Sequence, residues 1–314
     1  MPAPSAPLQS AVAMIVFNRP DNARRVLEAV AAARPARLYV IADGPRPDRP
    51  GEAERVAETR ALFDSLSWPC EVIRNFAPDN MGCRRRIVSG LDWLFEAEAQ
   101  AIILEDDCLP VPAFFRFADA MLARYRDDRR VFSIGGTCFA PPADPPGHYF
   151  SDYSTVWGWA TWRDRWARYV GDPTDADAIL RRKFAGRPVD RAYWAHFIEL
   201  ALSGPISAWD YQLLLSMWRE GGLCCRPTQN LVANIGFGPD ATHTTVIGRW
   251  AAALTAHPSD SDFTAGPASV AADTARDKWE ADTVYNVRLK TVLALYLPIL
   301  HHIRRRLFPR PDEV

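Results

Sequence analysis

Short apolar runs alternate with longer amphipathic stretches along the first 135 residues of the chain. The runs predict strands at 11–17, 38–42, 70–74, 101–104 and 131–134. Between them, apolar residues recur every three or four positions, which predicts helices at 52–66 and 81–98 and a helix that begins at Pro112. Ala23, Val26, Leu27 and Val30 form the apolar face of a further predicted helix. This alternation is typical of βαβ units. We therefore expect an α/β, Rossmann-like fold with a mostly parallel central sheet flanked by helices.

The rest of the chain is less regular. Four prolines between Ala140 and Gly147 predict a loop, and further helices are predicted at 191–202 and 209–220. We expect the chain to divide into a disordered leader at 1–10, a first half at 11–139, a smaller second half at 140–250 and a C-terminal extension at 251–314.

Composition and charge exclude several classes of protein. The chain has 314 residues, of which 48% are hydrophobic and 24% charged, as in ordinary globular proteins. Lys and Arg number 37 against 38 Asp and Glu, so no overall positive field exists and we expect no nucleic-acid partner. The six cysteines include no C-x-x-C pair and follow no secretory signal, which indicates reduced thiols and a cytoplasmic location.

The most informative motif is the acidic triplet Glu105-Asp106-Asp107, which directly follows the predicted strand at 101–104. Ligands of open α/β sheets bind at the carboxyl ends of the strands. Three adjacent carboxylates repel one another, and oxygen ligands suit Mn²⁺ or Mg²⁺, which commonly bind substrate phosphates as well. The triplet therefore predicts a divalent-metal and phosphate site. The alternative is that these acids only cap the helix that begins at Pro112.

Other strand ends carry candidate residues for the same site. Arg19 follows the first strand and Asp43 the second, where they could contact a nucleoside, although Asp-Gly-Pro is also an ordinary turn. Arg84 belongs to three arginines at the start of the helix at 81–98, where the helix dipole disfavours cations, so an anion such as a diphosphate is expected nearby. A solvated basic surface is the alternative for these arginines.

The second half contributes an acid and several aromatic side chains. Asp210 follows Trp209, and a carboxylate beside a large aromatic ring suits a general base, although Ser207 to Asp210 also matches a helix-capping pattern. Trp157 and Trp159 flank Gly158 and could form a platform for a sugar, as could Trp209, while the spacing of Trp159, Trp162 and Trp166 is that of a packed helical face. Thr242 and His243 lie in a Gly-rich loop suited to closing over phosphate, or they are polar surface residues.

Four ordered blocks between about Ala11 and His243 resemble the nucleotide-sugar glycosyltransferases of the GT-A fold, most of all N-acetylglucosaminyltransferase I and related bacterial enzymes. The sequences of these blocks are ILEDDCLPVPAFF, WGWATWRDRW, SAWDYQLLLSMWREGG and CRPTQNLVANIGFGPDATH. The resemblance implies that 11–139 binds the nucleotide-sugar donor and that 140–250 forms an acceptor-side subdomain. It does not extend into the C-terminal part after about Arg249.

The resemblance also implies a role for each candidate. Asp107 looks like the direct Mn²⁺ ligand, Asp106 like the ribose contact and Glu105 like the contact to sugar hydroxyls. Asp43 and Arg19 look like uridine-pocket residues, and Asp210 looks like the base that deprotonates the acceptor hydroxyl. The loop that contains Thr242 and His243 resembles the segment that orders over the diphosphate when donor binds.

We therefore expect a metal-dependent, inverting glycosyltransferase that moves a sugar, GlcNAc from UDP-GlcNAc, to a hydroxyl of a bacterial surface-glycan, lipopolysaccharide or exopolysaccharide acceptor. The alternatives are a transferase that uses another nucleotide sugar, or a non-catalytic glycan- or nucleotide-binding protein on the same scaffold. A nucleotidyltransferase would need a Gly-rich loop after the first strand, where this chain has FNRPDN.

The C-terminal extension carries a basic amphipathic pattern. Apolar residues between 284 and 308 are accompanied by Arg304, Arg305, Arg306 and Arg310. The pattern predicts peripheral contact of residues 284–310 with an anionic membrane on its cytoplasmic side, or a helix docked on the domain with its basic residues in water. The longest apolar run, at 292–300, has nine residues, whereas a membrane span needs about 20.

Overall fold

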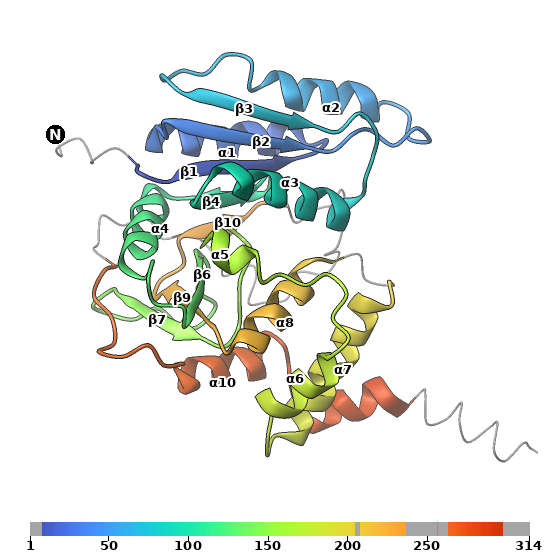
Figure 1. The fold of residues 1–314 in the computed structure, drawn as a ribbon, viewed down its shortest axis with the longest axis vertical. Coiled ribbons are helices and arrows are strands. Elements are labelled where there is room, and N and C mark those ends of the chain that lie inside the picture. Colours follow the sequence, from blue (N-terminus) through green and yellow to red (C-terminus); the bar gives the residue numbers. More distant parts are fainter. Residues whose placement is uncertain (1–7, 205–207, 237–255, 257–262, 298–314) are drawn as a thin grey trace, which may run out of the picture.

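The computed structural model describes residues 8–204, 208–236, 256 and 263–297. Within these residues an eight-stranded sheet runs in the order β3-β2-β1-β4-β8-β6-β9-β7, and β10 and β5 form a separate antiparallel pair (Figure 1). The strands are β1 (Ala11–Val16), β2 (Arg37–Ala42), β3 (Glu71–Phe76), β4 (Gln100–Glu105), β5 (Cys108–Pro110), β6 (Val131–Gly135), β7 (His148–Ser151), β8 (Trp159–Trp162), β9 (Leu223–Pro227) and β10 (Val232–Asn234). The helices are α1 (Pro20–Ala33), α2 (Glu52–Ala61), α3 (Cys83–Ala97), α4 (Pro112–Arg124), α5 (Arg163–Trp166), α6 (Ala176–Lys183), α7 (Pro188–Leu202), α8 (Asp210–Glu220) and α10 (Thr274–Thr283).

The sheet is covered on both faces, which confirms the α/β class predicted from the sequence. Val12, Met14 and Val16 of β1 belong to one buried cluster, with the apolar residues of α1 and α4. The intervening residues of β1, such as Ala13, belong to a second cluster with α3 and α8. Figure 1 shows α1 and α3 on opposite faces of the sheet. Because side chains alternate along a strand, a strand buried on both faces is apolar at every position.

The register of β1 with its two neighbours brings three strand ends to one level. β1 pairs in parallel with β2 and with β4, so that Val16 lies opposite Ala42 and Ile15 opposite Glu105. The residues that follow these strands therefore emerge together at one edge of the sheet, where ligands of such sheets bind.

Several strands come from the second half of the chain, where no strand was predicted. β8 lies between β4 and β6 and is antiparallel to both, and β9 pairs in parallel with β6. The helical interpretation of Trp159 and Trp162 is wrong, because both lie on β8, and Trp162 faces the α1 and α4 cluster while Trp159 faces the other. The helices α6, α7 and α8 pack together beside the sheet (Figure 1).

The N-terminal part of the described chain is held by helix α4. Of the predicted leader, residues 1–7 lie outside the described residues, while the backbone N–H groups of Gln9 and Ser10 donate to the Asp119 carboxylate. None of the helices in the described part of the chain is both long and apolar enough to cross a bilayer.

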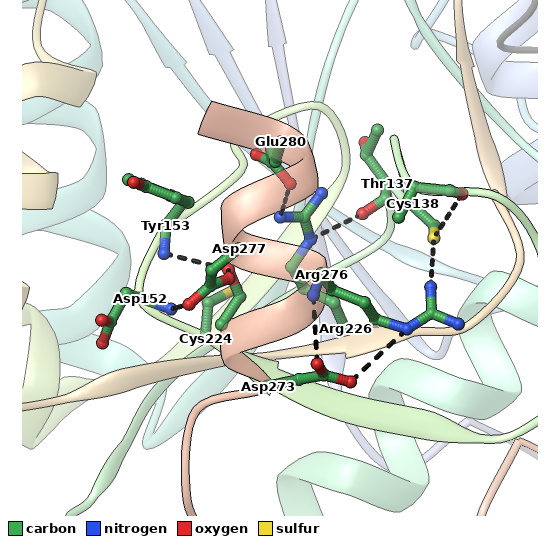
Figure 2. A network of polar contacts seen from close by, with 12 residues as sticks. Thr137, Cys138, Asp152, Tyr153, Cys224, Arg226, Asp273, Arg276, Asp277 and Glu280 are labelled. Carbon is green, nitrogen blue, oxygen red and sulfur yellow. Dashed lines mark hydrogen bonds and ion pairs between the residues drawn. The ribbon is translucent and has the colours of Figure 1, made fainter. Parts of the chain in front are cut away.

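The predicted C-terminal extension is joined to the sheet by a buried ion pair. Arg226 of β9 is 0% exposed, and its Nη1 donates to Glu280 of α10 at 2.7 Å (Figure 2). Its Nε donates to the Thr137 carbonyl at 2.9 Å, and its guanidinium lies over the Phe139 ring. Burial raises the pKa of Glu280, while the charge of Arg226 lowers it. The same helix places Asp277 to accept hydrogen bonds from the Ser151 hydroxyl and the Asp152 N–H.

Removing one partner of this ion pair should destabilise the fold strongly. Glu280→Gln leaves the Arg226 charge buried, and we expect a loss of about 3–5 kcal/mol in the free energy of unfolding, measured by urea denaturation. Lys278→Gln on the same helix removes the exposed pair of Lys278 with Asp282 and should cost less than about 0.5 kcal/mol. Equal, small losses in the two variants would show that the buried pair does not hold α10 in place.

Candidate functional site

A cleft of about 1040 Å³ opens at the carboxyl ends of β1, β2 and β4. Its lining includes Arg19, Asp43, all three acids of the triplet, Trp157, Trp209 and Asp210. The structure thus brings together most of the residues singled out in the sequence. They arrive from separate elements: the segment after β1, the segment after β2, the end of β4, and the start of α8.

Arg19 is the cation that contacts the acidic triplet. Its Nη1 donates to Asp107 Oδ2 at 2.9 Å and to Asp106 Oδ1 at 3.4 Å. The other oxygen of Asp106 accepts the backbone N–H of Phe17 at 3.2 Å. Because Phe17 and Arg19 both follow β1, the parallel pairing of β1 with β4 fixes these contacts.

The triplet carries more negative charge than its surroundings compensate. Burial raises the pKa of Glu105 well above its usual range, and the charges of Asp107, Asp106 and Asp210 raise it further. Burial and the charge of Asp107 likewise raise the pKa of Asp106 to about 7, against the opposing effect of Arg19. Carboxyl groups in this state gain stability in their ionised form when a cation binds.

Asp107 lies at the junction of the two sheets. The Ile235 N–H, next to β10, donates to the Asp107 backbone carbonyl at 2.8 Å. A Cβ atom on Gly236 would come within 2.2 Å of Asp107 Oδ2, so only glycine permits this close approach. Asn234 and Gly236 also line the cleft. The pairing of β10 with β5 therefore carries a distant segment to the acidic triplet.

Asp43 is buried and has a clear structural role. Its Oδ1 accepts the N–H groups of Gly44 at 2.9 Å and Met81 at 2.8 Å, and its Oδ2 accepts the N–H of Gly82 at 3.0 Å and Asn80 Nδ2 at 3.2 Å. These bonds fix the turn that leads into α3. Asp43 still lines the cleft, so its predicted contact with a nucleoside stays a prediction.

Asp210 is placed by a cluster of tryptophans. It is the first residue of α8, and the preceding Trp209 is 3% exposed. Trp209 packs against Trp159 and Trp166, with ring centroids 5.6 and 6.4 Å away. The rings hold the beginning of α8 against the sheet, so that the Asp210 carboxylate lies on the cleft wall and its charge reaches Glu105.

Two predicted site residues, Trp159 and Arg84, lie away from the cleft lining. Trp159 is 1% exposed and packs in the core between Trp166 and Trp209, so its ring cannot act as a sugar platform. Arg84 turns away, and its Nη2 donates to the Gly171 carbonyl and to Asp172 at 2.7 Å; the anion beside it is a side chain of the protein. Thr242 and His243 lie outside the described residues.

Other arginines line the cleft instead: Arg86, which belongs to the same predicted run as Arg84, and three arginines that the sequence did not single out. Arg46, Arg49 and Arg55 come from the segment that leads from β2 into α2, and Arg86 comes from α3. Arg86 is 4% exposed, burial lowers its pKa, and its Nε has no hydrogen-bond partner within the described residues. The signal for the first group was the arginine-rich run PRPDRPGEAER, which directly follows Asp43 and Gly44.

The residues present fit a divalent cation that is shared with a phosphate ligand. The described residues contain no group of three or more His, Cys, Asp or Glu side chains arranged to enclose a metal. Mg²⁺ and similar ions commonly bind through one or two carboxylates together with substrate phosphates, and therefore need no such group. The oxygen-only donor set and the raised pKa of Glu105 and Asp106 suit an ion of this kind. A cation at Asp107 would compete with Arg19 for Oδ2.

Comparisons with known proteins do not assign the chain to a family. No protein-family model matches it. No curated protein matches it either. Among solved structures, one of an active-site mutant of LgtC aligns with 69% of this chain and 72% of its own, at 14% identity and a TM-score of 0.35. A likeness this distant carries no argument about activity, so the function has to be argued from the site.

The role of Asp43 as an acceptor can be tested by a nearly isosteric change. Asp43→Asn places an amide NH₂ against N–H donors of the 80–82 turn, and we expect a loss of about 1–3 kcal/mol in the free energy of unfolding by urea denaturation. Asp79→Asn changes an exposed acid in the same turn and should alter stability by less than about 0.5 kcal/mol. Unchanged stability of Asp43→Asn would contradict the structural role.

Proposed function

We propose that this chain is a metal-dependent, inverting glycosyltransferase that moves a sugar from a nucleoside diphosphate donor to an acceptor hydroxyl. The observation that carries the proposal is the surplus of buried carboxylate at the end of β4, in a cleft that also holds a buried arginine. The α/β fold with ligand-facing strand ends, and the resemblance of the four sequence blocks to GT-A glycosyltransferases, support the same conclusion.

The electrostatics of the cleft support a ligand that brings charges of both signs. Burial disfavours the ionised forms of Glu105 and Asp106 and also the charged form of Arg86. A divalent cation would stabilise the ionised carboxylates, and a diphosphate would add a negative charge beside Arg86, whose Nη2 already donates to Asn75. A metal–nucleoside diphosphate complex supplies both in one ligand. A free sugar or a neutral glycan supplies neither, so these residues favour a nucleotide-sugar donor.

In the proposed reaction Asp107 would hold the divalent cation, Mn²⁺ or Mg²⁺, and Asp106 is the neighbouring carboxylate in the cleft. The ion would neutralise the negative charge that develops on the departing nucleoside diphosphate. Arg19 pairs with Asp107 at 2.9 Å and lines the same cleft, so it would lie beside the diphosphate as a second positive charge. The segment of Arg46, Arg49 and Arg55 lines the cleft beyond Asp43, where it can contact the anionic and polar groups of the nucleotide.

Asp210 is proposed as the general base. Its carboxylate accepts the proton of the acceptor hydroxyl as that oxygen attacks the anomeric carbon and the bond to the diphosphate breaks. A single displacement of this kind inverts the anomeric centre. Trp157 lines the same cleft and is half-buried, so it can offer an aromatic face to a sugar near the base. Trp209 is too deeply buried to act as a platform, and its role is to hold Asp210 in place.

The donor and acceptor rest on the resemblance in sequence. We propose UDP-GlcNAc as the donor and a bacterial surface-glycan, lipopolysaccharide or exopolysaccharide hydroxyl as the acceptor. The enzyme would act in the cytoplasm.

The assignment of roles can be tested without knowing the acceptor, because water can take its place. The experiment measures the UDP released by hydrolysis of each of a panel of UDP-sugars. We expect release with Mn²⁺ and none with a chelator. Asp107→Ala should abolish release and weaken UDP binding in Mn²⁺. Asp210→Asn should slow release by about 10²- to 10⁴-fold, the usual contribution of a general base, while UDP binding measured by calorimetry stays unchanged.

Asp172→Asn is the matched control, because Asp172 pairs with Arg84 away from the cleft lining and should leave release and binding unchanged. Wild-type turnover by Asp210→Asn would contradict its assignment as the base. Mn²⁺-dependent UDP binding without release from any sugar donor would overturn catalysis in favour of a nucleotide-binding protein on the same scaffold.

A further inference from the structure

The exposed large apolar side chains of the described residues gather on one helical segment. Residues 289–297 are helical, and they carry Leu289, Leu293 and Leu297, which are 59%, 49% and 57% exposed. A spacing of four places these leucines along one face of a helix. A row of exposed leucines on one face is typical of an interaction surface.

The opposite face of the same segment is seated on the protein. Val292 is buried, and Leu295 and Tyr296 pack against the second core cluster. The Tyr296 hydroxyl donates to the Ala192 carbonyl of α7 at 2.9 Å. Because its inner face is anchored in this way, the segment presents the leucine row outward. The three leucines are therefore exposed in the folded protein.

The charged residues within 288–297 are both basic. Arg288 and Lys290 flank Leu289 and are exposed. No acidic residue occurs between Thr283 and Pro311, whereas the chain as a whole has a net charge of -1. The sequence beyond the described segment adds four further basic residues, Arg304, Arg305, Arg306 and Arg310, which lie outside the described residues together with the rest of 298–314.

We propose that residues 288–297 are a docking surface for an anionic lipid bilayer, with Leu289, Leu293 and Leu297 entering the boundary between headgroups and acyl chains. Arg288 and Lys290 would lie at the level of the lipid phosphates. Charge complementarity selects this occupant. A second copy of the chain would bring two acid-free basic segments together, and like charges across an interface oppose association. The inference does not depend on glycosyl transfer.

Co-sedimentation of the full chain with vesicles tests the proposal. We expect binding to vesicles of phosphatidylcholine with phosphatidylglycerol, weaker binding at high salt, and none to phosphatidylcholine alone. The triple variant Leu289→Ser, Leu293→Ser, Leu297→Ser should lower the partition coefficient by about 10²-fold, because it removes the apolar surface that enters the bilayer. Circular dichroism of this variant checks that it remains folded.

Two single charge reversals distinguish the effect of charge within residues 288–297 from the effect of the net charge of the protein. Lys290→Glu should weaken vesicle binding by about tenfold or more, because each basic residue near the surface contributes about fivefold and the reversal adds repulsion. Lys278→Glu on α10, which lies outside the segment, should bind as the wild type does. Equal effects of the two reversals, no binding to anionic vesicles, or full binding by the serine variant would overturn the proposal. So would an oligomer that the serine variant abolishes, since the leucines would then be covered by a second copy.

Discussion

The structure depends on one electrostatic constraint: three consecutive carboxylates lie close together at the carboxyl end of β4. A strand buried on both faces ends in three consecutive acids, and burial raises the pKa of two of them, Glu105 and Asp106. Arg19 compensates part of this charge, and it is available only because β1 lies beside β4 in parallel register. The remaining negative charge is the basis of the proposal that a divalent cation binds in the cleft.

The surrounding elements hold that charge in place. Asp43 uses both of its oxygens to fix the turn before α3, and the tryptophans around Trp209 fix the beginning of α8 and with it Asp210. The Arg226–Glu280 pair joins the C-terminal α10 to β9, an inner strand of the sheet. Acids in this protein thus have two kinds of role: some accept hydrogen bonds that shape the cleft, and others remain available to a ligand.

The sequence allowed the first half to be predicted well, because its strands and helices follow each other and their periodicities are local. It could not predict β8, since Trp159 and Trp162 have the spacing of a helical face but lie on opposite faces of a strand whose partners, β4 and β6, are distant in sequence. The arginines show the same limit. Arg84 and Arg86 are neighbours in one motif, yet Arg84 turns to Asp172 and only Arg86 lines the cleft, a difference set by tertiary contacts.

The central claim is that the acids after β4 bind a divalent ion together with a diphosphate. A crystal structure of the protein soaked with MnCl₂ and UDP tests it most directly, because manganese is located by its anomalous scattering. The account predicts manganese bound to Asp107 and to the diphosphate, with Arg19 displaced from Asp107 Oδ2. Manganese elsewhere, or UDP bound with the Arg19–Asp107 pair intact and no ion beside it, would contradict the account.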